Sequence, residues 1–231
     1  MTKIAIIIPT YNEIDNIASL TRRIFAQKIE NLMIIFVDDN SSDGTGDEIA
    51  VYSKQFPVET IKRPGKLGIG SAYIAGFKKA LAEQNDLIFE MDADLSHAPE
   101  DIPKMIIAAD SGADLVIGSR KISGGKIIGW NLRRHLMSNG AMLVARLFLG
   151  LKTKDVTSGF RCYKKEVLEK INLDKIKSNG YAFQEEMLFL TEKLGLKVVE
   201  VPVSFIDRKY GKSKLSGKDI LEFFKVMIKL H

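Results

Sequence analysis

The sequence predicts an α/β fold in which helices cover both faces of a mostly parallel sheet. Two observations support it: short apolar runs alternate with helical patterns, and polar clusters follow three of those runs. Strands separated by helices form right-handed crossovers, which place the strands parallel to one another. Such sheets bind ligands at the carboxyl ends of their strands. We therefore expect the polar clusters to meet in one site.

The first half of the chain supplies most of the expected elements. The expected strands are residues 4–8, 33–37, 58–61, 87–91 and 115–117. Between them we expect helices at 14–27, 45–55, 71–83 and 99–109. The second half predicts a long helix near 131–149, a loop at 155–161, a helix near 184–194, a strand at 197–203 and a final helix. No repeat or linker interrupts residues 1–231, so we expect a single domain.

Composition limits the class of protein. The chain has 231 residues, of which 45% are hydrophobic and 27% are charged, as in ordinary soluble globular proteins. Cys162 is the single cysteine and cannot form an internal disulfide, which favours a reducing compartment. The apolar run at 4–8 is too short for a signal peptide or a membrane span.

The charge is unevenly distributed. Residues 120–152 contain seven Lys and Arg and no acidic residue, and residues 208–231 contain seven Lys and Arg against Asp219 and Glu222. A basic second half beside an acidic first half suggests an anionic partner: nucleic acid, phosphates or a lipid surface. The aromatic residues do not interleave with Lys and Arg as a stacking platform would need, so we expect no nucleic acid.

The segment FEMDADLSH, residues 89–97, contains three alternating carboxylates, Glu90, Asp92 and Asp94. Alternation along a strand would place all three side chains on the same side, and buried carboxylates need a positive partner. Two aspartates just past a strand suit Mg²⁺ or Mn²⁺, which also bind substrate phosphates. We interpret a cation as that partner, with a solvated turn before Pro99 as the alternative.

Two further segments contain residues that are typical of turns. In VDDNSSDGT, residues 37–45, Ser42 or Asp43 is the expected helix N-cap. Capping does not explain the pair Asp38 and Asp39, whose carboxylates could accept hydrogen bonds from a base or ribose. The glycines of residues 65–76 do not follow the first strand, as a dinucleotide-binding loop requires, so we expect a turn into a tightly packed helix.

Residues 130–151 form a dense apolar segment that Arg146 interrupts, so it is not a transmembrane helix. It could be a core helix, or an interfacial helix that presents arginines to phosphates beside lipid. The pattern favours the core helix.

Six motifs in order, IIIPTYNE, VDDNSSDGT, DADLSH, GSR, TSGFR and DRKYGKSK, run along nearly the whole chain. This set resembles the dolichyl-phosphate mannose synthases, which are inverting GT-A glycosyltransferases of family 2. The resemblance implies a metal-dependent enzyme that transfers mannose from GDP-mannose to a dolichyl or polyprenyl phosphate. Residues 1–120 would then bind the nucleotide sugar, and residues 121–231, with a basic C-terminal helix, would bind the acceptor.

The resemblance also implies roles for individual residues. Those expected to hold the guanosine are Pro9, Tyr11, Glu13, Val37 and Asp39. Those expected at the sugar diphosphate are Asp92, Ala93, Asp94 and Arg120, with Asp94 on Mg²⁺ or Mn²⁺ and Asp94 and Arg120 catalytic. Those expected at the acceptor phosphate are Arg134 and Ser138, while Arg208 and Lys214 close over the phosphates. Some relatives have Gln where Ser96 stands, so Ser96 would reach the metal only through water.

Location and alternatives follow from the same reasoning. We expect a peripheral protein at the cytoplasmic face of an anionic membrane, held there by its basic C-terminal helix, by an anchoring partner or by a C-terminal transmembrane segment. A polyprenyl-phosphate glucosyltransferase using UDP-glucose is the alternative enzyme. A magnesium-binding receiver-type signalling module is the non-enzyme alternative, although it leaves the basic half unexplained.

Overall fold

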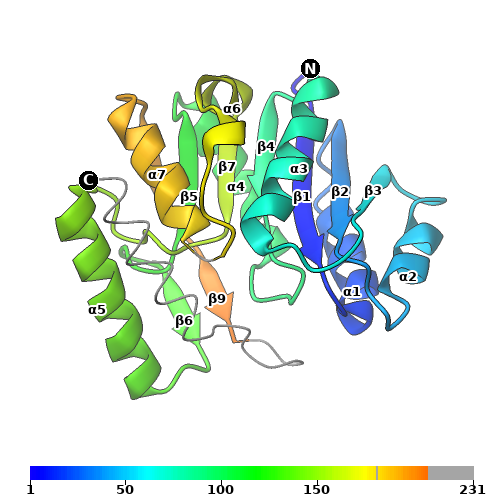
Figure 1. Cartoon of the computed structure of the whole chain (residues 1–231), viewed down its shortest axis with the longest axis horizontal. Helices are drawn as coiled ribbons and strands as arrows, with labels where there is room; N and C mark the ends of the chain where they lie inside the picture. Colours follow the sequence, from blue (N-terminus) through cyan, green and yellow to red (C-terminus); the bar gives the residue numbers. More distant parts are fainter. Residues whose placement is uncertain (181, 208–231) are drawn as a thin grey trace.

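The computed structural model describes residues 1–180 and 182–207, and within them seven strands form one sheet (Figure 1). Its order is β3-β2-β1-β4-β7-β5-β8. The strands are β1 (Ile4–Thr10), β2 (Leu32–Asp38), β3 (Val58–Lys62), β4 (Leu87–Glu90), β5 (Leu115–Ser119), β7 (Arg161–Lys164) and β8 (Val198–Pro202). All neighbouring pairs are parallel except those of β7, which is antiparallel to β4 and β5. The prediction of a mostly parallel sheet is confirmed.

Helices cover both faces of this sheet, because alternate residues of each strand are buried on opposite sides. Ile7 of β1 packs in one core with α3 (Ile69–Ala82), α6 (Lys165–Lys170) and α7 (Phe183–Lys193). Ile6 and Ile8 pack in the other core with α1 (Ile14–Phe25), α2 (Thr45–Tyr52) and α4 (Ile102–Asp110). Burial on both faces explains why the strands are almost continuously apolar. Short 3₁₀ turns lie at Pro99–Asp101 and Leu173–Lys175.

The glycine-rich segment 65–76 forms the expected turn and continues into the tightly packed first half of α3. A Cβ atom at Gly76 would collide with the Cγ2 of Ile7 in β1. A Cβ atom at Gly70 would lie 2.6 Å from the backbone oxygen of Ser178. Glycine at these positions lets α3 pack closely on the sheet and on the segment before α7.

A second, two-stranded parallel sheet joins β6 (Lys126–Ile128) and β9 (Ser204–Ile206), which the sequence did not predict. It lies beside α5 (Leu132–Leu149), at one side of the molecule (Figure 1). His97 forms an isolated bridge to Phe205 of β9, and this connects the small sheet to the DADLSH loop.

The prediction that residues 130–151 form a core helix is wrong. Among the α5 side chains that the structure describes, only Met142, Ala145 and Leu149 are buried. The large apolar side chains of α5 that are exposed are Leu132, Leu136, Met137, Leu143, Val144, Leu147 and Phe148. The apolar residues extend around the helix beyond the face that contacts the core, so their number gave the impression of a core helix. In the part of the chain that the structure describes, no helix is both long and apolar enough to cross a membrane.

Candidate functional site

A pocket of about 140 Å³ lies at the carboxyl ends of β1 and β4. The predicted site residues that line it are Pro9, Tyr11, Glu13, Asp39, Asp92, Ala93 and Asp94. Thr10, Lys66, Gly68, Ile69 and Ala72 complete the lining. The structure therefore brings together residues that are up to 85 positions apart in the sequence, because parallel strands end at the same edge of the sheet.

The loop after β4 has a defined shape. The backbone N–H of Asp92 donates to Nδ1 of His97 at 3.2 Å, and Tyr73 Oη donates to Asp92 Oδ1 at 3.3 Å. The backbone N–H of Ser96 donates to Asp94 Oδ1 at 3.0 Å. Leu95 adopts a left-handed conformation with φ of 61°, which is typical of a tight turn. These contacts orient both aspartates at the pocket.

The residues of this loop fit a divalent cation. Asp92 and Asp94 offer hard oxygen ligands, and Mg²⁺ or Mn²⁺ is usually held by one or two carboxylates together with substrate phosphates. The buried Ser96 Oγ has no hydrogen-bond partner among the described residues, so it can still accept or donate beside Asp94.

Glu90 does not belong to this site, and the prediction that all three carboxylates face one cation is wrong. β4 ends at Glu90, so strand alternation does not continue to Asp92. Glu90 is fully buried, and burial raises its pKa to about 7 although the charge of Arg161 lowers it. Arg161, at the start of β7, is the positive partner that the sequence had placed in a loop. Its guanidinium acts on Glu90 through its charge and donates hydrogen bonds to the backbone oxygens of Ser158, Gln184 and Val156 at 2.7–2.9 Å.

The two aspartates at the carboxyl end of β2 have different surroundings. Asp38, the last residue of β2, accepts hydrogen bonds from Thr10 Oγ1 and from the backbone N–H of Ser41, both at 3.1 Å, so it joins the end of β1 to the loop after β2. Asp39 lines the pocket and forms a buried ion pair with Arg63. The predicted cap is corrected, because Gly44 occupies the N-cap position of α2.

Arg63 was missed by the sequence reasoning. It donates to Asp39, to Ser71 Oγ at 2.7 Å and to the backbone oxygen of Gly68 at 3.1 Å, so it fixes one wall of the pocket. Its position directly after β3, at the ligand-binding edge of the sheet, was the available signal. Val37, in contrast, belongs to β2, is buried in the core and does not line the pocket.

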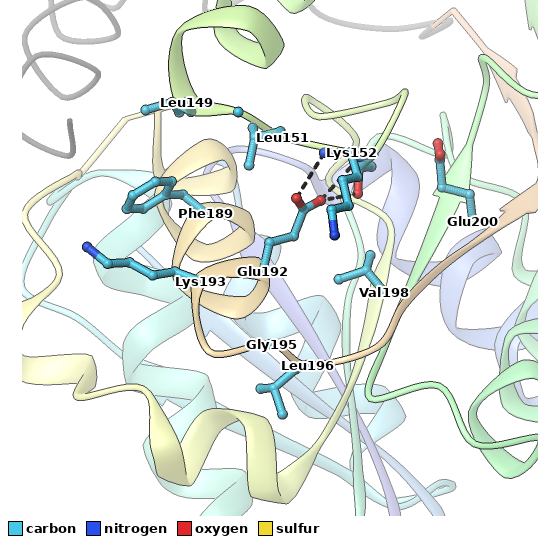
Figure 2. Close-up of a pocket in the computed structure, with 12 residues that line it drawn as sticks. Leu149, Leu151, Lys152, Phe189, Glu192, Lys193, Gly195, Leu196, Val198 and Glu200 are labelled. Atoms are coloured by element: carbon cyan, nitrogen blue, oxygen red, sulfur yellow. Dashed lines mark hydrogen bonds between the residues drawn. The ribbon is translucent and has the colours of Figure 1, made fainter.

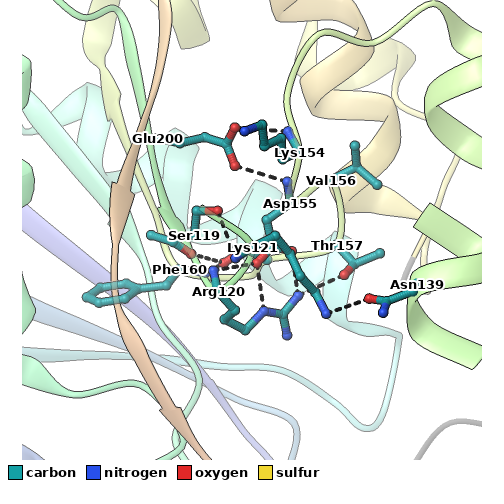
Figure 3. Close-up of polar contacts among 12 residues, drawn as sticks. Ser119, Arg120, Lys121, Asn139, Lys154, Asp155, Val156, Thr157, Phe160 and Glu200 are labelled. Carbon is teal, nitrogen blue, oxygen red and sulfur yellow. Dashed lines mark hydrogen bonds and ion pairs between the residues drawn. The ribbon is translucent and has the colours of Figure 1, made fainter. Parts of the chain in front are cut away.

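Arg120 follows β5 and lies near the DADLSH loop. Burial lowers the pKa of His97, while the charges of Asp92, Asp94 and Asp155 raise it and that of Arg120 lowers it. All four charged groups therefore lie within electrostatic range of one imidazole. Arg120 itself forms a bidentate ion pair with Asp155 (Figure 3).

Arg134 and Ser138 lie one turn apart on α5. Nη1 of Arg134 donates to Asp207 at 2.7 Å, and its guanidinium lies 4.2 Å from the centre of the Trp130 ring. The guanidinium of Arg120 lies 5.9 Å from the centre of the same ring. Trp130 thus brings together the arginine predicted for the donor and the arginine predicted for the acceptor, which sequence reasoning did not anticipate. Arg208 and Lys214 lie outside the described residues.

A larger pocket of about 510 Å³ contains none of the predicted residues (Figure 2). It lies between the end of α5, α7 and β8. Glu192 of α7 points across it and accepts hydrogen bonds from the backbone N–H groups of Lys152 and Thr153 at 2.9 and 3.2 Å. Because this carboxylate fastens the loop after α5, we interpret the pocket as a surface groove beside a structural contact.

Known proteins resemble the chain in sequence. The family described as glycosyl transferase family 2 matches residues 5–172. The undecaprenyl-phosphate mannosyltransferase of Micrococcus luteus is 44% identical over 93% of this chain and 88% of its own length. The polyprenol monophosphomannose synthase of Mycolicibacterium smegmatis is 43% identical over 96% of this chain and 84% of its own. The dolichol-phosphate mannosyltransferase of Pyrococcus furiosus is 42% identical over 99% of this chain, which spans 63% of that relative.

The fold resembles that of solved structures. Glucosyl-3-phosphoglycerate synthase from Mycobacterium tuberculosis, in complex with Mn²⁺, UDP and glucosyl-3-phosphoglycerate, superposes with a TM-score of 0.71. That match covers 99% of this chain and 80% of the other at 19% identity, so it shows the fold alone. The architecture is the GT-A fold, and the chain belongs to glycosyl transferase family 2.

Proposed function

We propose that this protein transfers mannose from GDP-mannose to a polyprenyl phosphate, such as dolichyl phosphate, with inversion at the anomeric carbon. Three relatives that are 42–44% identical are named as mannosyltransferases or mannose synthases of polyprenol or dolichol phosphate. The observation that carries the proposal is that the guanidiniums of Arg120 and Arg134 both lie against the indole ring of Trp130, beside the DADLSH loop. An enzyme that transfers a sugar from a nucleoside diphosphate to a phosphate must hold two anions close together, and two neighbouring guanidiniums can do so.

The donor would occupy the pocket at the ends of β1 and β4. Its guanosine would contact Pro9, Tyr11, Glu13 and Asp39, while Val37, which lies in the core, would support the end of β2 without touching the guanosine. Asp94, with Asp92, would hold Mg²⁺ or Mn²⁺, and Ser96 would contact it through water. When bound, the cation would supply positive charge to the diphosphate of the donor. Arg208 and Lys214 remain proposed phosphate contacts outside the described residues.

The reaction needs little acid or base catalysis. A phosphate monoester is already anionic at neutral pH, so one of its oxygens can attack the anomeric carbon without losing a proton. A new C–O bond forms, the bond to the β-phosphate of GDP breaks, and its electron pair leaves with GDP. Attack opposite the leaving group converts an α-linked donor into a β-mannosyl phosphate. Arg120 would stabilise the charge that develops on the departing diphosphate.

The acceptor phosphate would bind at α5, through Arg134 and Ser138. The guanidinium uses Nη1 for Asp207 and has a planar fork of five donors, so it can bind a phosphate and keep this ion pair. The exposed apolar side chains of Leu136 and Met137 lie next to these residues on α5 and would contact the lipid chain. The same surface supports peripheral binding at the cytoplasmic face of a membrane.

The decisive experiment is transfer of labelled mannose. Purified protein, GDP-[¹⁴C]mannose, Mn²⁺ and a polyprenyl phosphate should yield label in the lipid phase, and the product should show the β configuration by NMR. UDP-glucose is the matched alternative donor. Greater transfer from UDP-glucose would show that the donor is UDP-glucose rather than GDP-mannose. An α-linked product would exclude inversion. Calorimetry with GDP, UDP and ADP in the presence of Mn²⁺ tests base selection independently of turnover.

A further inference from the structure

The side chain of Arg120 is held along one edge by a buried carboxylate from the loop before β7 (Figure 3). Nε donates to Asp155 Oδ2 at 2.8 Å and Nη2 donates to Asp155 Oδ1 at 2.6 Å. Nη2 also donates to Thr157 Oγ1 at 2.8 Å, and the backbone N–H of Arg120 donates to Asp155 Oδ2 at 2.8 Å. Four hydrogen bonds thus fix the end of β5, the side chain and the loop relative to one another.

A second carboxylate holds Asp155 in place. Glu200 of β8 accepts hydrogen bonds from the backbone N–H groups of Lys154 and Asp155 at 2.9 and 3.0 Å. β8 is the neighbour of β5 in the sheet, with Ile117 opposite Glu200. The contact therefore anchors the loop to the same sheet that carries Arg120.

The remaining freedom of the guanidinium is limited by aromatic rings. It lies 5.3 Å from the centre of the Phe205 ring and 5.9 Å from that of Trp130. Only 8% of the Arg120 side chain is exposed, and the Asp155 side chain is completely buried. Among the described residues, none accepts a hydrogen bond from Nη1, which points away from Asp155 in Figure 3.

We propose that Asp155 is a positioning residue that fixes Arg120 so that Nη1 is presented to the diphosphate of the donor. This inference rests on the proposed function, because Arg120 touches the reacting groups only if that site binds a sugar nucleotide. Asp155 touches neither substrate and acts through Arg120. Glu200 supports it by holding the loop.

The negative charge of Asp155 makes it possible to distinguish a role in positioning Arg120 from a purely structural ion pair. A permanent carboxylate partner cancels most of the net charge of Arg120, so the guanidinium acts as an oriented donor rather than as a general attractor of anions. Burial alone would raise the pKa of Asp155, but the hydrogen bonds and charge of Arg120 hold it below its ordinary value, so the carboxylate stays ionised at neutral pH. Removing that charge should misplace Arg120 and should not weaken anion binding.

The test is a double-mutant cycle with Asp155→Asn, Arg120→Gln and both together, measured as mannose transfer. Asp155→Asn should lower kcat about tenfold to a hundredfold, because small misplacements of a catalytic group have effects of that size. Calorimetry should show GDP affinity that is unchanged or higher. In the Arg120→Gln background, Asp155→Asn should cause no further loss, because its effect passes through Arg120. Asp114→Asn, at the other end of β5, is the matched control and should keep full activity.

Two outcomes would overturn the proposal. The first is a loss of kcat in the double mutant that equals the product of the losses in the two single mutants. The second is that Asp155→Asn lowers GDP affinity, kcat and melting temperature together. If Asp155→Asn does not fold, Glu200→Gln takes its place in the same cycle, with a smaller expected loss of kcat that again requires Arg120.

Failure of the proposed function can be separated from failure of this inference. If the wild-type protein transfers no mannose, the NMR signal of the Arg120 Nε–H group still reports its contact with Asp155. The signal should shift in Asp155→Asn and stay unchanged in Asp114→Asn. An unshifted signal in Asp155→Asn would refute positioning, whatever reaction the protein performs.

Discussion

Glu90 and Asp94 are four residues apart and have opposite environments. Glu90 ends a buried strand and faces Arg161 inside the protein, whereas Asp94 follows in a loop and lines the pocket. The change from strand to loop separates them, because the regular alternation of side chains ends with β4. Only the carboxylates past the strand can therefore meet a ligand.

Asp94→Ala should remove most of the Mn²⁺-dependent affinity for GDP while the fold persists. Loss of a charged contact of this kind lowers affinity roughly tenfold to a hundredfold. Calorimetry with and without chelator measures the effect. Asp110→Ala, an exposed aspartate at the end of α4, is the control and should bind as wild type does. Equal GDP affinity of the wild type in excess chelator would contradict metal-dependent binding.

Arg134→Ala should raise the apparent KM for polyprenyl phosphate about tenfold to a hundredfold, because a charge-assisted contact to the acceptor is lost. The KM for GDP-mannose should barely change. Arg133→Ala tests the neighbouring arginine, which is exposed on the same helix, and should leave both constants unchanged. If Arg134→Ala instead loses donor affinity and keeps its acceptor KM, the arginine serves the other phosphate.

At the scale of elements, α5 combines arginines with an exposed apolar surface, which is the pattern of helices that lie in a membrane interface. The triple variant Leu136→Ser, Met137→Ser and Leu147→Ser should lower the partition coefficient onto anionic vesicles by about a thousandfold or more in a co-sedimentation assay, since each buried apolar side chain contributes roughly 1.5–3 kcal/mol. Ile107→Ser, exposed on α4, is the control. Unchanged sedimentation of the triple variant would exclude α5 as the lipid-binding surface.

Parallel strands and their helices were predictable because long apolar runs leave few alternatives, as at β1 and β2. β7 was not, because its four residues begin with Arg161 and end with Lys164, and a buried arginine resembles a loop residue in sequence. β6 and β9 have three residues each, which is too short for a periodic pattern.

The gathering of the DADLSH and PTYNE residues at one pocket was predictable from the sequence, since PTYNE spans the end of β1 and DADLSH comes just after β4. The partners of charged residues were not. Arg63 is 24 positions from Asp39, and Arg120 is 35 positions from Asp155. Such pairs depend on the order of strands in the sheet, which one sequence does not reveal. The surface position of α5 was missed because a helix whose apolar residues are exposed and a helix whose apolar residues face a core have the same pattern in sequence.

For the whole molecule, buried carboxyls make stability depend on pH. Burial raises the pKa of Glu90 to about 7, above the ordinary value of 4.5. Below pH 4.5 the group is neutral in both states, and above pH 7 it is ionised in both. Because the folded state disfavours the ionised form, stability is lost as pH rises between these values, by up to about 3 kcal/mol.

Glu90→Gln should therefore reduce the fall in the free energy of unfolding between pH 5 and pH 8, measured by urea denaturation. Part of the decline in the free energy of unfolding should remain in this variant, because burial also raises the pKa of Glu185 to about 7. Glu100→Gln is the control, because its pKa is lowered by a surface pair with Arg23 and it should keep the full decline. A decline as large in Glu90→Gln as in the wild type would show that Glu90 does not titrate in this range.

The antiparallel strand β7 also constrains the order in which the chain can assemble during synthesis. β7 lies between β4 and β5, although both of those strands are translated before it. A ribosome that has released residues 1–120 has supplied the neighbouring strands β3, β2, β1 and β4 and the single strand β5, but no strand that joins β5 to the others. We expect a fragment ending at residue 120 to lack the cooperative unfolding of the complete chain, and a fragment extended past Lys164 to gain protection of β5 amides from hydrogen exchange. The two proposed substrate-binding halves would then be synthesised one after the other but would fold together.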